Sequence, residues 1–207
     1  QSVMFDNQVA NMSTTTTNSK YVDFHASTYG LNTQVSYTTA GQNPAEGRPG
    51  SKYDYNVLDA TMEYDLNIKG LSVKPGVTYR SAIYDDRSYA ENGQGTLNGE
   101  QIMTTFGGGV RMEYSVLDEK LRLTGGIRID KFTHPGNWFS SYQAAASYKL
   151  NDKNLVRLVY SKAYRSPFIF DTYLDYSGQT PVGPGMYSQV NVTGNKGLDL
   201  LNSNMVE

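Results

Sequence analysis

LRLTGGIRIDKF, at residues 121–132, alternates between apolar and polar side chains at every second position. The odd-numbered positions from 121 to 129 are Leu, Leu, Gly, Ile and Ile, and the even-numbered positions from 122 to 130 are Arg, Thr, Gly, Arg and Asp. Successive side chains of a β-strand point to opposite faces, so this stretch predicts a strand with one apolar face and one polar face.

The same alternation recurs along the rest of the chain. It is clear in residues 57–66, 104–116 and 139–150, and less regular in 154–165, where apolar and basic residues share a face. The expected strands run about 10–16 residues, whereas strands of soluble proteins cluster near 5–6 and a tilted membrane strand needs about 9–11. Pro75 falls inside one expected strand and cannot donate to a ladder, so we expect a bulge or irregular pairing there.

The connections between these strands alternate between short and long. Tight turns are expected at 29–32, 67–70, 117–120 and 151–154, and each contains Gly, Asn or Asp, which suit hairpin turns. Longer polar segments are expected at 41–52, 85–100 and 166–190. Long strands with short turns at one end and long loops at the other are typical of outer-membrane barrels. The sequence therefore predicts an all-β fold, an antiparallel transmembrane β-barrel.

Composition is consistent with this fold and excludes several others. The 207 residues include no cysteine, so a disulfide framework and thiolate metal sites are excluded. A net charge of -2 without any basic run argues against a nucleic-acid partner. The mean hydropathy of -0.52 is compatible with strands that are apolar on one face, and no stretch approaches the roughly 18 apolar residues of a membrane helix. No signal peptide opens the chain at Gln1, so we expect an exported protein to begin upstream.

Tyrosine recurs just before the tight turns. Tyr64, Tyr114 and Tyr148 occupy matching places in EYDLNIKG, EYSVLDEK and SYKLNDKN. We expect them at one height on the outward face, as an aromatic girdle with the rings in the apolar band and the hydroxyls among lipid headgroups. The alternative is the general preference of tyrosine for strands.

The last third of the chain resembles a known family. Residues 139–167 contain a strand, a short polar turn and a second strand that ends in Val156 to Pro167, VRLVYSKAYRSP. Gly194, Asn195 and Leu198 follow after a long segment. This arrangement resembles TonB-dependent outer-membrane receptors over roughly residues 121–207, except that Asp-Leu-Leu at 199–201 replaces the usual Lys-Pro-Glu. The Tyr-rich style of residues 20–40 is similar to receptors from Bacteroidetes.

The resemblance implies a location and a function. Residues 1–207 would form part of a single barrel domain of about 22 strands in the bacterial outer membrane, with the plug domain and the barrel ends absent from this chain. Such receptors are active transporters that take up a large, scarce solute such as an iron chelate, haem, a cobalamin or a glycan, and they perform no covalent chemistry. The implied partners are outer-membrane lipid and the TonB complex, reached through the plug, and a surface lipoprotein lid is compatible with the resemblance.

Candidate ligand-binding residues follow from the same placement. The lumen-facing candidates are Arg111, Arg128, Arg157 and Arg165, and the loop candidates are the aromatic residues Tyr89, Phe168, Tyr173 and Tyr176. Most of the charged lumen residues, which also include Glu113, Arg122 and Asp130, are expected to form salt bridges between strands. Aromatic residues in loops suit the capture of a bulky ligand, and they can equally stack among themselves.

No catalytic constellation, cofactor motif or metal motif is present. His25 is expected on a polar strand face and His134 in a loop, solvated rather than bound to a ligand. Asp85, Asp86 and Glu91 are expected to be solvated acids rather than a Ca²⁺ site. The glycines at 107–109 do not form a phosphate loop, and glycines on a lumen face can make room for a plug.

Two other functions fit the alternation. One is a small passive or structural outer-membrane barrel, since about eight strands can close alone. The other is a surface-exposed, adhesin-like β-domain. The outward face distinguishes them, because a membrane barrel exposes an apolar band about 25 Å tall whereas a soluble domain buries its apolar face.

Overall fold

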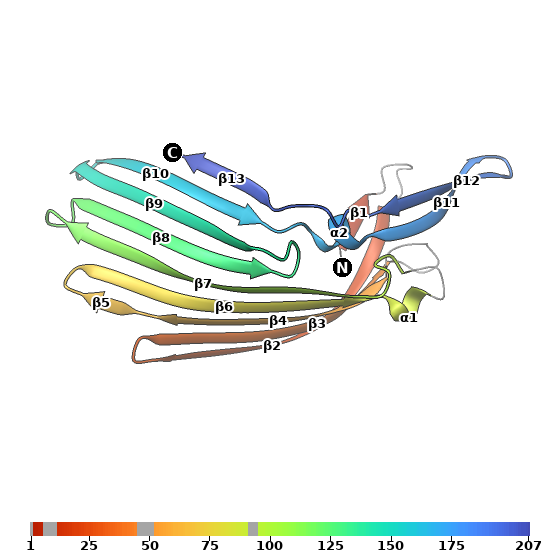
Figure 1. The fold of residues 1–207 in the computed structure, drawn as a ribbon, viewed down its shortest axis with the longest axis horizontal. Helices are drawn as coiled ribbons and strands as arrows, with labels where there is room; N and C mark the ends of the chain where they lie inside the picture. The colour runs from red at the N-terminus through yellow and green to blue at the C-terminus, as the bar shows by residue number, and fades with distance from the viewer. Residues whose placement is uncertain (1, 6–11, 45–51, 91–94) are drawn as a thin grey trace.

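The computed structural model describes residues 2–5, 12–44, 52–90 and 95–207, which form a long, curved antiparallel sheet (Figure 1). The strands follow one another in the order β1-β2-β3-β4-β6-β7-β8-β9-β10-β13, and the short β5 pairs with β6. The main strands are β1 (Ser2–Phe5), β2 (Met12–Thr28), β3 (Leu31–Pro44), β4 (Tyr53–Tyr64), β5 (Leu66–Ile68), β6 (Leu71–Asp85), β7 (Glu100–Val116), β8 (Leu121–Phe132), β9 (Trp138–Asn151), β10 (Asn154–Arg165) and β13 (Leu201–Val206).

The predicted strands are confirmed, and eight of them are 12–17 residues long. Their ends separate into two groups in Figure 1. The short turns lie at the left, and the helices α1 (Arg87–Ala90) and α2 (Ile169–Tyr173) lie at the right with a projecting hairpin. At this loop end, residues 45–51 of the predicted loop at 41–52 lie outside the described residues. Within the described residues β1 does not pair with β13, so the sheet does not close on itself.

The tight turns have the positive φ values of hairpin turns, although Tyr29 and Lys69 adopt some of them in place of the predicted Gly, Asn or Asp. Tyr29 and Gly30 have φ of 46° and 85°, and Lys69 and Gly70 have φ of 41° and 83°. Two successive positive φ values characterise the two-residue hairpin turn whose twist matches that of the flanking strands. In the β9–β10 turn, the Asn151 side chain accepts a hydrogen bond from the Lys153 backbone N–H at 3.0 Å. These local interactions fix the register of the long strands.

The pairing around Pro75 is irregular, as expected, although it contains no bulge. On one side β6 pairs without interruption with β7, and Pro75 lies opposite Val110. On the other side the ladder stops after the pair of Glu63 with Gly76 and resumes in the same register at Leu66 with Val73. The break between β4 and β5 therefore lies opposite Pro75, the residue that lacks a backbone N–H.

A predicted loop contains regular structure instead. Within residues 166–190, which we expected to be an open loop, the chain forms α2 and then the hairpin of β11 (Asp175–Gly183) and β12 (Met186–Thr193). Gly185 has a φ of 73° at its tip. Most of the Gly and Pro residues of this hairpin lie at its tip, whereas Gly178 lies inside β11, and Val190 and Val192 share a face of β12, as in a short strand.

The sheet has two chemically different faces. The face that carries Arg122, Thr124 and Arg128 on β8 is called the polar face, and the face that carries Leu123, Ile127 and Ile129 is called the apolar face. Leu123, Ile127 and Leu158 on the apolar face are 41%, 50% and 63% exposed, so no part of the described chain covers them. An uncovered apolar face that extends over several long strands is the lipid-contacting surface of a membrane barrel. No helix in the described part of the chain is long and apolar enough to cross a membrane.

The three tyrosines near the turns all lie on the apolar face and are 40–43% exposed. They do not share one row of paired residues. Tyr64 lies level with the gap opposite Pro75, Tyr114 lies four residue pairs nearer the turns, and Tyr148 lies two pairs nearer still. Such a progressive shift is what tilted barrel strands require for residues at one membrane height. The aromatic girdle itself stays a prediction.

The orientation of the two faces predicts how neighbouring substitutions differ. Ala144 lies on the apolar face and Gln143 on the polar face of β9, and both are exposed. Ala144→Arg should lower the free energy of unfolding in lipid bilayers by about 2–4 kcal/mol, because it places a guanidinium in the hydrocarbon. Gln143→Arg should change it by about 0.5 kcal/mol at most. Denaturant titration of the full-length protein tests this, and equal losses for both variants would contradict the assignment of the faces.

Candidate functional site

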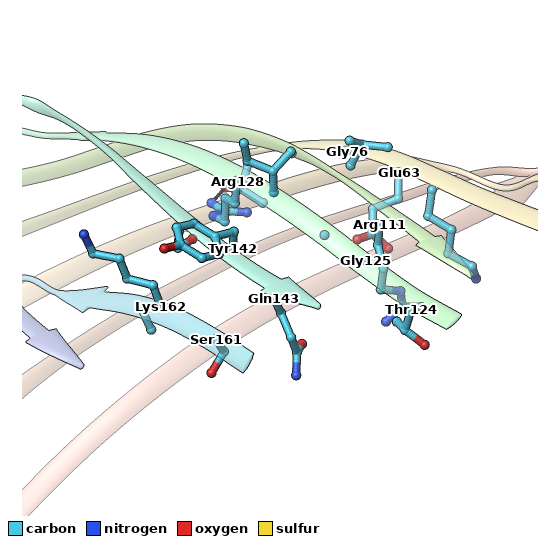
Figure 2. Close-up of a pocket in the computed structure, with 18 residues that line it drawn as sticks. Glu63, Gly76, Arg111, Thr124, Gly125, Arg128, Tyr142, Gln143, Ser161 and Lys162 are labelled. Atoms are coloured by element: carbon cyan, nitrogen blue, oxygen red, sulfur yellow. Dashed lines mark hydrogen bonds between the residues drawn. The ribbon is translucent and has the colours of Figure 1, made fainter. Parts of the chain in front are cut away.

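A depression of about 430 Å³ lies on the polar face of β6, β7 and β8, near the middle of the sheet. Its floor consists of backbone, because Gly76 pairs with Gly109 and Gly126 lies beside them, opposite Arg111. Figure 2 shows Gln143 and Ser161 at this depression pointing to one side of their strands, with Tyr142 and Lys162 pointing to the other. The absence of side chains on three adjacent strands leaves room for a ligand or a packed segment.

Charged side chains surround this glycine floor. Lys74 forms an ion pair of 2.7 Å with Asp65, and Glu63 lies beside Gly76. Arg111 is exposed beside them and forms no ion pair with any described residue. An exposed guanidinium without a carboxylate partner can bind an anionic group with two parallel hydrogen bonds.

Arg128 is held by a network. Its Nε donates to Asp130 at 2.8 Å, and Nη2 donates to the Thr78 hydroxyl two strands away. The bond crosses the bare position of Gly107 on β7, where an added Cβ would lie 1.8 Å from Asp130 Oδ1. Gly107 thus makes room for the Arg128–Asp130 pair. That glycines on this face also make room for a plug stays a prediction.

The remaining arginine candidates lie elsewhere on the polar face. Arg157 lines a second depression of about 580 Å³ nearer the turns, together with Glu113, Arg122 and Lys149. Arg122 pairs there with Glu113, as expected of lumen charges. Arg157 and the exposed Arg165, at the loop end of β10, form no ion pair with described residues. The structure therefore brings Arg111 and Arg128 together and leaves Arg157 and Arg165 apart.

The polar face becomes apolar at the loop end. Tyr53, Leu97 and Ile169 are buried there, with exposed fractions of 8%, 0% and 2%. The partly buried residues packed against them are Tyr55, Tyr84, Met103, Phe170 and Tyr173. The segment around Leu97 and the helix α2 thus fold onto β4, β6 and β7, and the two loops form one packed structure at the rim.

Asp86 holds one of these loops in place. Its carboxylate accepts backbone N–H groups from Thr96 and Leu97 at 2.6 Å each and from Gly99 at 2.8 Å. The residue is 1% exposed, so the expectation of a solvated acid is wrong for Asp86. The sequence gives no sign of this, because the hydrogen-bond donors lie ten to thirteen residues away.

The neighbouring carboxylate Asp85 is also engaged. It accepts hydrogen bonds from the Arg87 side chain at 2.6–3.1 Å, and these hydrogen bonds lower the pKa of Asp85 below its usual range. Arg87 also pairs with Glu100 at 2.7 Å. Glu91, the third acid considered for Ca²⁺, lies outside the described residues. Among the described residues there is no cluster of three or more side chains that could hold a metal ion.

The loop aromatics occupy four different environments. Tyr89 is half-buried, and its hydroxyl donates to Asp54 at 3.2 Å. Phe168 is 55% exposed and stacks on Phe170. Tyr173 packs into the loop-end cluster, and Tyr176 lies over Gly178 in the hairpin. Tyr173 therefore packs against other residues of the chain, which is the alternative to ligand capture. Phe168 is exposed enough to contact a ligand.

The two histidines also differ. His25 lies on the polar face of β2, where its Nε2 contacts Asp23 at 2.9 Å. His134 was expected to be solvated, but the ring is half-buried against Tyr173, with ring centroids 6.1 Å apart, and Nε2 is buried. The expectation for His134 is wrong because α2 folds back beside it, a contact between residues distant in sequence.

Several residues of this site were missed by sequence reasoning. Lys74 and Thr78 carry no motif, although their even numbering places them on the polar face of β6. The loop-end cluster had a weak signal, because the odd positions of β4 begin with Tyr53, Tyr55 and Val57 and become polar only at Asp59. An inward face that changes from apolar to polar along one strand indicates a covered rim above an open lumen.

Comparisons with known proteins agree with this architecture. The family model described as "TonB dependent receptor-like, beta-barrel" matches residues 3–203. The solved siderophore receptor PirA from Pseudomonas aeruginosa is similar, with a TM-score of 0.70 and 16% identity over 95% of this chain and 36% of that one. PirA from Acinetobacter baumannii has a TM-score of 0.64 and 14% identity over 93% of this chain and 32% of that one. The chain thus spans about a third of the length of these structures. No curated protein matches the sequence.

The glycine contacts predict a difference between two Gly→Ala variants. Gly107→Ala should lower the free energy of unfolding by about 1–3 kcal/mol, because the methyl group would displace the Arg128–Asp130 pair. Gly125→Ala should be neutral or stabilising by about 0.4–1 kcal/mol, since nothing lies within 4 Å of its added Cβ. Denaturant titration measures both, and a neutral Gly107→Ala would show that the pair does not fill that space.

The Asp86 hydrogen bonds predict a local opening of the loop. Asp86→Ala should speed hydrogen exchange of the amides at 96–99 by roughly tenfold or more, because hydrogen bonds to a charged group contribute about 1.5–3 kcal/mol each. Exchange in the strands should stay unchanged. Asp152→Ala, in an exposed turn, is the matched control. Unchanged exchange at 96–99 would mean that the loop-end cluster alone holds the loop.

Proposed function

Because this chain belongs to the TonB-dependent receptor-like β-barrel family and is an outer-membrane protein, we propose that it forms part of the wall of an active transporter. The transporter takes up a large solute, with energy supplied through TonB. The polar face lines the lumen through which the solute passes. The chain carries no step of covalent chemistry in this proposal.

The observation that supports transport most directly is a set of three arginines on the polar face that form no ion pair with described residues. Three acidic residues of the polar face each form an ion pair with an arginine of that face: Asp59, Glu113 and Asp130. Arg111, Arg157 and Arg165 have no such partner among the described residues. A wall that serves only as structure gains nothing from exposed guanidinium groups, whereas a solute path uses them to attract and orient anions.

The solute class follows from the same charges. Of the solutes considered, an iron chelate, haem, a cobalamin and a glycan, those with carboxylate, phosphate or other anionic groups suit the arginines best. Arg111 and Arg128 border the glycine floor, Arg157 lies towards the turns, and Arg165 lies towards the loops. We infer that Phe168 and Tyr89 contribute to capture at the loop end, and that Tyr173 and Tyr176 mainly shape the rim.

The two alternative functions are less well supported. A small passive barrel requires the sheet to close, and in the described residues its outer strands do not pair. An adhesin-like soluble domain requires a buried apolar face, whereas Ile127 and Leu158 are at least half exposed. The proposal includes coupling to TonB through a plug domain, and a surface lipoprotein lid is compatible with it.

Growth of a deletion strain tests the proposed function. Four probes represent the solute classes: a ferric catecholate chelate, haem, cyanocobalamin and a neutral oligosaccharide. We expect the strain to lose growth on one anionic probe, and the intact gene to restore it only in cells with functional TonB. Growth on all four probes, or restoration without TonB, would contradict the proposal.

The arginines allow a sharper test with the responsive probe. Arg111→Gln with Arg157→Gln should weaken binding roughly tenfold or more, because both guanidiniums face the lumen without a carboxylate partner. Arg80→Gln with Arg122→Gln removes the same charge from arginines that already pair with Asp59 and Glu113, and it should weaken binding far less. Equal effects would show that only the total charge matters.

A further inference from the structure

An apolar groove of about 650 Å³ crosses the lipid-facing side of β7 to β10. Its walls are large side chains, Met112, Tyr114, Leu158 and Tyr160. Its floor is made of the small residues Gly125, Ala144 and Ala146, each on the apolar face of the sheet. Larger apolar residues at these positions would fill the space between the walls. The small residues therefore leave the groove open on the outer surface of the sheet.

Two lysines lie on the same face between this groove and the loop end. Lys162 lies two residue pairs above Gly125, level with Ile127 and Tyr142, and Lys131 lies four pairs higher, opposite Trp138. Each ammonium lies over an aromatic ring, Lys162 at 5.1 Å from the Tyr164 centroid and Lys131 at 5.7 Å from that of Trp138.

These cations have no acidic counterpart on their strands. The apolar faces of β8, β9 and β10 carry the two lysines and no carboxylate. The hydroxyls of Tyr142, which pairs with Lys162, and of Tyr160, in the groove wall, lie 3.4 Å apart as a polar step in an otherwise apolar surface. From the turns to the loops, the apolar groove is therefore followed by the two hydroxyls and Lys162 and then, beyond Ile129, by Lys131.

We propose that this surface is a binding site for a membrane lipid that carries phosphate on its headgroup. An acyl chain lies in the groove over Gly125 and Ala144. The phosphate accepts hydrogen bonds from Lys162, and Lys131 attracts the same anionic headgroup from the loop side. The aromatic rings hold the lysine stems upright, so the ammonium groups stay at headgroup level.

The charge pattern selects this occupant over other membrane components. A neutral lipid or a second copy of the apolar face would leave two ammonium groups at the hydrocarbon boundary without an anion, which is costly. A phosphate-bearing lipid satisfies the cations and fills the groove together. The site lies on the outer face of the same strands whose inner face lines the lumen. Lipid binding there is therefore independent of the transported solute.

Native mass spectrometry of the full-length protein in detergent tests the site. The probes are dioleoyl phosphatidic acid, dioleoyl phosphatidylcholine and dioleoylglycerol, which share acyl chains and differ in the headgroup. We expect wild-type protein to retain phosphatidic acid most strongly. Lys131→Gln with Lys162→Gln should weaken its retention about thirtyfold, because each lysine near an anionic lipid contributes about fivefold.

Two further variants separate the headgroup from the groove. Lys120→Gln with Lys153→Gln removes the same charge at the turn end and should leave retention unchanged. Gly125→Leu fills the groove and should weaken binding of all three lipids, while heat resistance of the barrel on gels verifies folding. Equal retention of the three lipids by the wild-type protein, or an unaffected double lysine variant, would overturn the proposal.

Discussion

The structure depends on the requirement that every backbone N–H and C=O in a lipid bilayer be hydrogen-bonded within the protein. An unsatisfied group in hydrocarbon costs several kcal/mol, because no water is present to replace the missing partner. The ladders that join β2 to β10 meet this requirement over long stretches. Two-residue turns join β2 to β3, β5 to β6 and β9 to β10, and the interruption at Pro75 is confined to one side of one strand.

The backbone hydrogen bonds between strands are the same for both faces of the sheet. The side chains make the two faces different. On the outer side, apolar residues contact lipid, and small residues make a groove beneath two lysines. On the inner side, glycines lower the surface so that Arg128 can reach across β7 to Thr78. At the loop end, the inner side is covered by loop segments held by Asp86 and by the cluster around Leu97. One sheet thus provides an outer face that contacts lipid, an inner face that carries charged side chains, and a loop end that is covered by packed segments.

Much of this architecture could be predicted from the sequence, because strand alternation and hairpin turns are local properties. LRLTGGIRIDKF forms β8 with the bounds that its pattern indicates. The features that escaped prediction arise from contacts between distant segments. Asp86 gives no sign that three backbone groups will surround it, and His134 gives none that α2 will fold beside it. The groupings of arginines on the lumen wall depend on register across several strands, which alternation alone does not supply.

If the apolar face contacts lipid, successive residues of one strand face lipid and water in turn, and the absence of cysteine allows a direct measurement. Single cysteines placed at each position from 140 to 149 of the full-length protein in outer membranes can be labelled with a membrane-impermeant maleimide. We predict fast labelling at the odd positions, such as 143 and 147, and slow labelling at the even positions, such as 144 and 146. Labelling without a period of two, or with the opposite phase, would contradict it.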